Sequence, residues 1–301
     1  MIPVYKHTNI KNLSIEAQKL LVHCMVCPRK CGVNRIKEEL GQCQTGKDAM
    51  VCSYGTHFGE ERELVGLHGS GTIFFSYCNL HCVFCQNYDI SQRGEGYKVS
   101  AEQLAKMMLD LQNQGCHNIN LVSPTHIVPQ FLQAFLIAKE KGLNLPIVYN
   151  SGGYDSVETL QLLDGVIDIY MPDTKYSSND LGEKYSGVKD YWTVNQLVLK
   201  EMYRQVGDLV INKQGLAEQG LLVRHLVLPN QIAGSFEVLK FIAEEISKNT
   251  YVNIMDQYRP CYLGDRFTEL SRRITQQEYN EVVNFAHKLG LGLRNLLCNH
   301  E

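Results

Sequence analysis

Three cysteines lie in one short run of the chain, as Cys78, Cys82 and Cys85, with the spacing C-x3-C-x2-C. A [4Fe–4S] cluster has four irons, and four cysteine thiolates would ligate all of them. Three local thiolates leave one iron free for a non-protein ligand, much as a catalytic metal site keeps one position open. The spacing therefore favours a cluster that performs chemistry.

A zinc ion is the alternative metal for this loop. Structural zinc takes four ligands, often from two C-x2-C pairs. Here the fourth ligand would have to be His81 or a distant residue, and the position of His81 between Cys78 and Cys82 strains simultaneous ligation. The cluster is the favoured interpretation.

The composition narrows the class of protein. The chain has 301 residues and a formal net charge of -3, so we expect no nucleic-acid partner. No segment approaches the roughly 18 apolar residues of a membrane span, and no signal-peptide pattern is present, so we expect no membrane association and a cytoplasmic location. Eleven cysteines in such a chain favour metal ligation over disulfides.

From about residue 72 onward, strand-like and helix-like segments alternate. We expect strands at 72–76, 119–122, 146–150, 166–170, 221–228, 251–255 and 293–297. We expect helices at 14–23, 100–115, 128–141, 189–206 and 235–248, and others that begin at 156 and 275.

Such alternation is typical of a parallel sheet covered by helices. The units are too few for an eight-fold barrel, so we predict an α/β fold with a partial (β/α)6 TIM-like barrel at 66–301. A doubly wound sheet is the structural alternative. Residues 1–65 are expected to form an N-terminal cysteine-rich extension. In either fold the reactive groups gather where strands end, and the three cysteines directly follow the first strand.

In this position the cysteine motif resembles that of the radical S-adenosylmethionine (SAM) superfamily. Other segments are similar to the pyruvate formate-lyase activating enzymes of that superfamily, and they are Cys85–Asp89, Tyr149–Tyr154, Met171–Lys175 and Val223–Pro229. The resemblance spans nearly the whole chain, which looks like a separate branch of homologues of those enzymes.

The resemblance implies an activity. SAM would bind the open iron, and an electron from the cluster would cleave it to methionine and a 5′-deoxyadenosyl radical that removes a substrate hydrogen. It also implies partners: a reductant protein such as flavodoxin or ferredoxin, and a protein or peptide substrate.

The resemblance assigns residues as well. Cys78, Cys82 and Cys85 would be the cluster ligands, and no catalytic residue is assigned beyond the cluster. Phe84 would lie near the adenine, and Asp173 and Lys175 would contact the charged methionine end of SAM. The remaining expected cofactor contacts are Asn87, Ser123, Asn150, Ser151, Arg224 and Gln257.

This chain departs from the family pattern at three of the strand ends. Asn150 and Ser151 stand where the activating enzymes carry Asp and Thr. The segment 122–126, with Ser123 and Thr125, replaces a Gly-Gly-Glu-like turn, and Gln257 or Tyr258 stands near the position of a histidine.

Arg224 and His225 interrupt an apolar strand, so at least one should point into the barrel and find a partner there. The polar residues of segment 55–61 could line a pocket, but an ordinary solvated turn is the favoured interpretation.

A second group of cysteines lies near the N-terminus, as Cys24, Cys27, Cys31 and Cys43, with Cys52 as a substitute ligand. Four thiolates at this spacing could hold zinc or a second iron–sulfur cluster. A thiol-rich structural turn or a substrate-contact segment is the alternative.

Three functions are therefore open. The first is a radical SAM enzyme that activates a glycyl radical enzyme. The second is a radical SAM enzyme that modifies another peptide or a small molecule. The third, of a different class, is a non-catalytic iron–sulfur or zinc protein.

Overall fold

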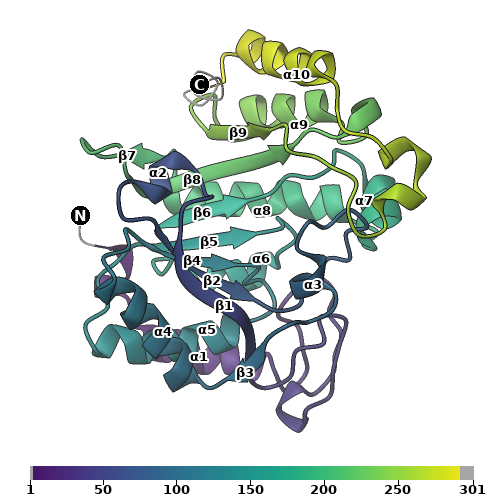
Figure 1. The fold of residues 1–301 in the computed structure, drawn as a ribbon. Coiled ribbons are helices and arrows are strands. Elements are labelled where there is room, and N and C mark those ends of the chain that lie inside the picture. The colour runs from purple at the N-terminus through teal and green to yellow at the C-terminus, as the bar shows by residue number, and fades with distance from the viewer. Residues whose placement is uncertain (1–2, 292–301) are drawn as a thin grey trace.

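The computed structural model describes residues 3–291, whose strands form one nine-stranded sheet. Six neighbouring strands run parallel, and helices cover their outer side (Figure 1). In spatial order they are β2 (Ser70–Phe75), β4 (Ile119–Val122), β5 (Ile147–Ser151), β6 (Ile169–Pro172), β8 (Ala217–Leu226) and β9 (Tyr251–Met255). Within residues 3–291, β2 and β9 do not pair, so the sheet is not closed. The predicted partial barrel is confirmed.

Three antiparallel strands extend this sheet at its edges, and they are β1 (Ala49–His57), β3 (Tyr97–Val99) and β7 (Val210–Ile211). β1 pairs with β2 on one side and with β3 on the other. Sequence analysis did not predict β1, because its second half is mostly exposed and lacks a clear apolar alternation. β1 lies before the expected domain boundary at residue 65, so that part of the chain contributes a strand to the barrel sheet.

Helices connect the parallel strands and cover the sheet. They are α4 (Ala101–Asn113), α5 (Val128–Glu140), α6 (Val157–Gln161), α8 (Tyr191–Val206), α9 (Ser235–Phe241) and α10 (Gln276–Leu289). Both predicted capping boxes are present, at Ser100 with Gln103 and at Thr275 with Glu278. In the described part of the chain, no helix combines the length and the apolar character needed to cross a membrane.

Several boundaries differ from the predicted ones. α1 spans Ile10–Lys19 rather than 14–23, because the Asn9 side chain accepts a hydrogen bond from the Asn12 amide and caps its first turn. The helix predicted at 235–248 is divided, because a π-helical segment follows α9 at Ile242–Ile246. Three short helices were not predicted, and they are α2 (Arg62–Val65), α3 (Tyr88–Ser91) and α7 (Asn179–Ser186). The strand predicted at 293–297 lies outside the described residues.

The α2 segment fills one end of the barrel interior. Leu64 is fully buried, and it packs in one cluster with residues of the barrel strands, namely Val148, Ile169, Met171 and Leu222. Asn118, just before β4, donates a hydrogen bond to the Leu64 carbonyl at 2.8 Å. Most of these contacts lie near the starts of the strands, so the interior is left open toward their carboxyl ends.

We expect Leu64→Ala to lower the free energy of unfolding by about 2–5 kcal/mol, because a buried side chain would leave a cavity in this floor. Leu67→Ala, in the same segment, is the matched control, since Leu67 is 89% exposed. The control should change stability by less than about 0.5 kcal/mol. Urea unfolding followed by circular dichroism measures both, and equal losses would contradict the filled floor.

Candidate active site

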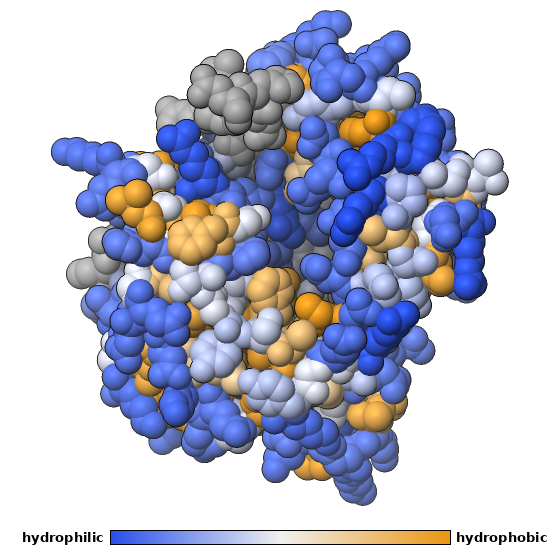
Figure 2. All heavy atoms as spheres, in the orientation of Figure 1, coloured by the Kyte–Doolittle hydropathy of each residue, from blue (hydrophilic) through white to orange (hydrophobic). Residues whose placement is uncertain are grey.

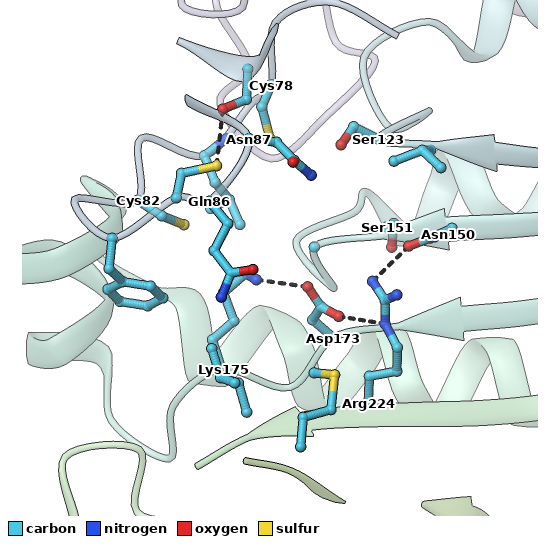
Figure 3. A pocket seen from close by; sticks show the side chains of 18 of the residues that line it. Cys78, Cys82, Gln86, Asn87, Ser123, Asn150, Ser151, Asp173, Lys175 and Arg224 are labelled. Atoms are coloured by element: carbon cyan, nitrogen blue, oxygen red, sulfur yellow. Dashed lines mark hydrogen bonds and ion pairs between the residues drawn. The ribbon is translucent and has the colours of Figure 1, made fainter. Parts of the chain in front are cut away.

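The cysteine loop leaves the barrel directly after β2. Tyr77 adopts a positive φ of 65° and turns the chain out of the strand. A cavity of about 250 Å³ opens here, and Cys78, Cys82 and Cys85 all line it. Figure 3 shows Cys78 and Cys82 beside the polar residues of the strand ends. The other walls come from the carboxyl ends of the parallel strands, where barrel enzymes collect their reactive groups.

Each of the three sulfur atoms has a hydrogen-bonding group beside it. The pairs are Leu80 N with Cys78 Sγ at 3.4 Å, Ser186 Oγ with Cys82 Sγ at 3.0 Å, and Ser91 Oγ with Cys85 Sγ at 3.1 Å. Amides and hydroxyls that donate to sulfur stabilise its anionic form and tune a cluster bound there.

The charge balance of the loop also fits a metal cluster. Burial raises the pKa of the Cys78 thiol to about 12 and raises the pKa of Cys82, whereas Lys175 lowers both. Such thiols ionise when a metal brings positive charge. Among residues 3–291, no three His, Cys, Asp or Glu side chains are grouped as ligands of one metal ion. A [4Fe–4S] cluster differs from a single ion because each thiolate binds a different iron, and the three cavity thiols fit that arrangement.

Phe84 forms an apolar wall beside the cysteines. Its ring, 6% exposed, makes edge-to-face contacts with Tyr176 and Tyr258, with centroid distances of 6.3 and 5.8 Å. Tyr258 is buried, and its hydroxyl donates to the Leu270 carbonyl at 2.7 Å, so this residue supports Phe84. Gln257, which directly precedes Tyr258 in the sequence, lines the cavity.

A network of charges crosses the opposite wall (Figure 3). Asp173 accepts hydrogen bonds from Lys175 Nζ at 2.7 Å and from Arg224 Nε at 2.9 Å. Arg224 also donates to Asn150 Oδ1 at 2.7 Å. Burial alone would raise the pKa of Asp173, but Arg224 and Lys175 hold it below its usual value. Asp173 is therefore ionised at neutral pH and fixes two cations at the cavity wall.

The residues after β4 and β5 divide between the cavity and a buried network. Ser123 adopts a positive φ of 60° and lines the cavity, and its amide donates to the Asn150 carbonyl at 2.8 Å. The hydroxyls of Thr125 and Ser151 both donate to Asp155, at 2.6 and 2.7 Å. Asp155 thus holds the turns after the two strands together.

The two polar residues of β8 point to different places. Arg224 lines the cavity, which confirms that one of the pair faces the barrel interior. His225 is fully buried, with Nδ1 2.7 Å from the Thr174 carbonyl and Nε2 2.8 Å from Ser235 Oγ at the start of α9. Burial lowers the pKa of His225 to about 4, so its ring is neutral at pH 7 and ties β8 to its neighbours.

Every residue predicted to hold the first cluster or SAM lines this single cavity. They are Cys78, Cys82, Phe84, Cys85, Asn87, Ser123, Asn150, Ser151, Asp173, Lys175, Arg224 and Gln257. Their individual roles stay predictions. They meet because parallel strands place their carboxyl ends along one edge of the sheet.

Two carboxylates in the segment favoured as a solvated turn are buried instead. That interpretation is wrong for Glu60 and Glu61, whose side chains are 8% and 9% exposed. Glu60 Oε2 lies 3.7 Å from Arg224 Nη1. Burial raises the pKa of Glu60 to about 7, although Arg224 opposes the rise. Two signals in the sequence pointed this way: the polar residues of 55–61 were the less favoured candidates for a pocket wall, and Arg224 in an apolar strand demands an anion without saying which.

The N-terminal cysteines form a separate group. Cys24, Cys27 and Cys43 are buried and Cys31 is partly exposed. Burial raises the pKa of Cys27 far above its usual value, and the other three thiols add to this rise, so each of them lies within electrostatic range of Cys27. Cys52 lies on β1 and is partly exposed.

Two arginines anchor this group to the rest of the protein. Arg35 is 1% exposed, lies 4.0 Å from Cys24 Sγ, and donates to the His126 carbonyl at 2.8 Å. Arg29 donates to the Asn79 carbonyl at 2.8 Å, within the cluster loop itself. The N-terminal segment is therefore packed against the loop that carries the other three cysteines.

The fold and the cavity define an open barrel enzyme with three thiols at the end of its first parallel strand. Residues 72–202 match the radical SAM superfamily. The chain is 33% identical over 303 residues to "Uncharacterized protein MJ0674" of Methanocaldococcus jannaschii, a match that covers 96% of this chain and 82% of that protein. This chain belongs to the radical SAM superfamily and is a radical SAM enzyme.

Solved structures were matched as well. A radical SAM methyltransferase from Sphaerobacter thermophilus superposes with a TM-score of 0.50 at 14% identity, over 73% of this chain and 64% of that chain. This chain thus spans less than two thirds of the methyltransferase, and the likeness concerns the fold alone. Methylornithine synthase (PylB) is a further match, with a TM-score of 0.47 at 16% identity, over 94% of this chain and 69% of that chain. Two other matched structures are likenesses of fold alone: SuiB of Streptococcus suis, described as bound to SAM, and TsrM of Kitasatospora setae, described with cobalamin and a [4Fe–4S] cluster bound.

We expect Asp173→Asn to lower the free energy of unfolding at pH 7 by about 3 kcal/mol, because Arg224 and Lys175 lose the carboxylate between them. Asp164→Asn is the matched control: Asp164 pairs with Arg204 at the surface, is 47% exposed, and should contribute less than about 1 kcal/mol.

The effect should depend on pH. The pKa of Asp173 is depressed in the folded protein, so its contribution is complete above the unfolded value, near 4, and is lost as the pH falls through the folded value. Urea unfolding at pH 7, 4 and 3 should show the difference from wild type shrinking at the lowest pH. A constant difference would contradict this account of Asp173.

Proposed function

We propose that this protein cleaves SAM reductively at a [4Fe–4S] cluster held by Cys78, Cys82 and Cys85, and uses the 5′-deoxyadenosyl radical to remove a hydrogen atom from a substrate. One observation carries this proposal. The three thiols share a cavity with polar side chains from the ends of all the other parallel strands. Superfamily membership favours this function over a non-catalytic iron–sulfur or zinc protein.

When bound, the cluster supplies an electron and an open iron to SAM. The chain's own residues bind and orient SAM. Lys175 and Arg224 offer cations that suit the carboxylate of SAM, and Asp173 offers an acceptor that suits its ammonium group. We propose that Phe84, supported by its ring contacts with Tyr176 and Tyr258, contacts the adenine and keeps water from that side of the cavity.

We propose activation of a glycyl radical enzyme as the leading activity, because the segments at Cys85–Asp89 and Met171–Lys175 resemble those of glycyl radical activases. Modification of another peptide or of a small molecule is the second candidate. The buried carboxylates Glu60 and Glu61 favour this candidate, because a glycine offers them no side chain to bind.

An electron donor is also required. We propose a reductant protein such as flavodoxin or ferredoxin, acting in the cytoplasm, where thiols stay reduced. The outer part of the cluster loop supports this proposal: Gln86 and Asn87 are exposed, and the Arg93 side chain is 62% exposed. A docked protein could approach the cluster from this side.

We expect Cys82→Ala to abolish 5′-deoxyadenosine formation, because the cluster would lose one of its three thiolates. The protein is purified anaerobically, reconstituted with iron and sulfide, reduced with dithionite and given SAM, and the product is quantified by liquid chromatography. Cys116→Ala is the matched control, since Cys116 is buried beside Thr56 and does not line the cavity, and it should keep its activity. Absence of the product from iron-replete wild type would contradict the proposal.

We further propose that Cys24, Cys27, Cys31 and Cys43 bind a metal, either a zinc ion or a second cluster. Because no three such side chains in residues 3–291 are already grouped around one ion, a zinc ion would have to draw these thiols together. Arg35 supports this proposal. In the described part of the chain no carboxylate pairs with its buried guanidinium, which lies beside the Cys24 sulfur. Metal-bound thiolates would supply the negative charge that a buried cation needs.

Metal analysis tests this second site. With zinc at the N-terminus, wild type should hold about four irons and one zinc per chain; with a second cluster it should hold about eight irons. Cys27→Ser should remove the N-terminal metal and leave the iron of the cavity cluster in place, because the two groups of ligands are separate. Cys116→Ser serves as the control. Wild type with about four irons and no zinc after loading with either metal would rule the site out.

A further inference from the structure

A second cavity lies beside the cofactor cavity and has a volume of about 530 Å³. The segment 58–63 and residues of β9 form its walls, and it shares Arg224, Met255 and Gln257 with the cofactor cavity. Figure 2 shows a hollow near the centre of the molecular face in view. Because the two cavities share walls, a molecule in the second would lie next to the place expected for SAM.

Four carboxylates line this second cavity, and two guanidinium groups oppose them. The carboxylates are those of Glu60, Glu61, Glu63 and Asp256, and the guanidinium groups are those of Arg62 and Arg224. Arg224 is already bound by Asp173. The cavity, which we call the acidic chamber, therefore carries net negative charge when these groups are ionised and favours a cationic ligand.

Glu61 gives independent evidence that a hydrogen-bond donor is missing from the described part of the chamber. Its Oε1 accepts a hydrogen bond from Asn253 Nδ2 at 3.0 Å. Its Oε2 is buried and has no hydrogen-bond partner within residues 3–291. Buried carboxylate oxygens in native proteins have donors, and an unmade hydrogen bond to a charged group is costly. A bound ammonium or guanidinium group would provide the donor.

Glu60 is incompletely paired as well. Its 3.7 Å contact with Arg224 Nη1 is longer than a hydrogen bond, and Asp173 competes for the same guanidinium. Burial raises the pKa of Glu60 to about 7; Arg224 and the Asn120 side chain oppose the rise, and the nearby Glu61 and Asp173 add to it. A cation in the chamber would favour the ionised form of Glu60 and bind to it.

The chamber also has apolar walls. Phe58, Ile254 and Met255 line it together with the carboxylates. An apolar surface next to acidic groups suits a side chain with an alkyl stem and a cationic end. We propose that the acidic chamber binds the alkylammonium or alkylguanidinium group of the substrate through Glu60 and Glu61. The reaction of the bound substrate rests on the proposed function, whereas the binding of its cationic group rests on the residues of the chamber alone.

Calorimetry on the reconstituted, SAM-free protein tests this inference. The probes are Nα-acetyl-lysine methylamide, its uncharged analogue Nα-acetyl-norleucine methylamide, and 1,5-diaminopentane. We expect a charged probe to bind at least about tenfold more tightly than the norleucine probe, as a charge-assisted hydrogen bond predicts. Tighter binding of the lysine probe than of the diamine would indicate a peptide-borne cation, and the reverse would indicate a free amine.

Glu60→Gln and Glu61→Gln should each reduce this preference, and the double variant should remove it. Glu158→Gln, a carboxylate in the first turn of α6 that lines neither cavity, is the matched control and should keep it. Circular dichroism checks the fold, and either single variant suffices if the other misfolds.

Equal binding of charged and neutral probes by wild type would overturn the inference, as would an unchanged preference in the glutamine variants. Binding is measured without SAM, so failure here leaves the deoxyadenosine experiment untouched. Failure of that experiment would likewise leave the binding result standing.

Discussion

The cofactor cavity depends on the ion pairs that the Asp173 carboxylate makes with Lys175 and Arg224. Asp173 lies just beyond β6, and its backbone forms an isolated parallel β-bridge with Arg224 on β8. The Thr174 amide donates a hydrogen bond to the Arg224 carbonyl at 2.8 Å. The register of two neighbouring strands thus places the guanidinium beside the carboxylate, and Lys175 completes the group. Two cations taken from water need such a partner, because their desolvation is costly. The backbone pairing therefore brings together the carboxylate and the two cations whose charges balance.

The short segment that precedes β2 carries out two tasks in an incomplete barrel. Leu64 fills the interior near the strand starts, and Glu60 and Glu61 supply carboxylates closer to the strand ends. An eight-stranded barrel fills its interior with side chains from its own strands. With fewer strands, this chain uses a segment from outside the parallel set, and the acidic character of the second cavity follows from the residues in that segment.

The strand ends were predictable because a parallel sheet imposes a rule that applies to every strand. Once the sequence indicated alternating strands and helices, Cys78, Ser123, Asn150 and Lys175 had to meet at one edge, and they line one cavity. No comparable rule places Glu60. Its burial depends on how a connecting segment folds back against β8, and this long-range packing leaves no periodic pattern in the sequence. β1 was missed for a similar reason, because its partners rather than its own residues make it a strand.

Packing links the two groups of cysteines more closely than their separation in sequence suggests. Arg35 lies beside Cys24 and donates to the His126 carbonyl, and His126 Nε2 lies 3.1 Å from the Ser76 carbonyl, just before the cluster loop. Burial lowers the pKa of His126 to about 3, so its neutral ring donates to that carbonyl and accepts no second charge beside Arg35. These contacts join the N-terminal thiols to the backbone that presents Cys78. Outer contacts of this kind determine how precisely metal ligands are held, so the N-terminal segment acts as a support for the cluster loop.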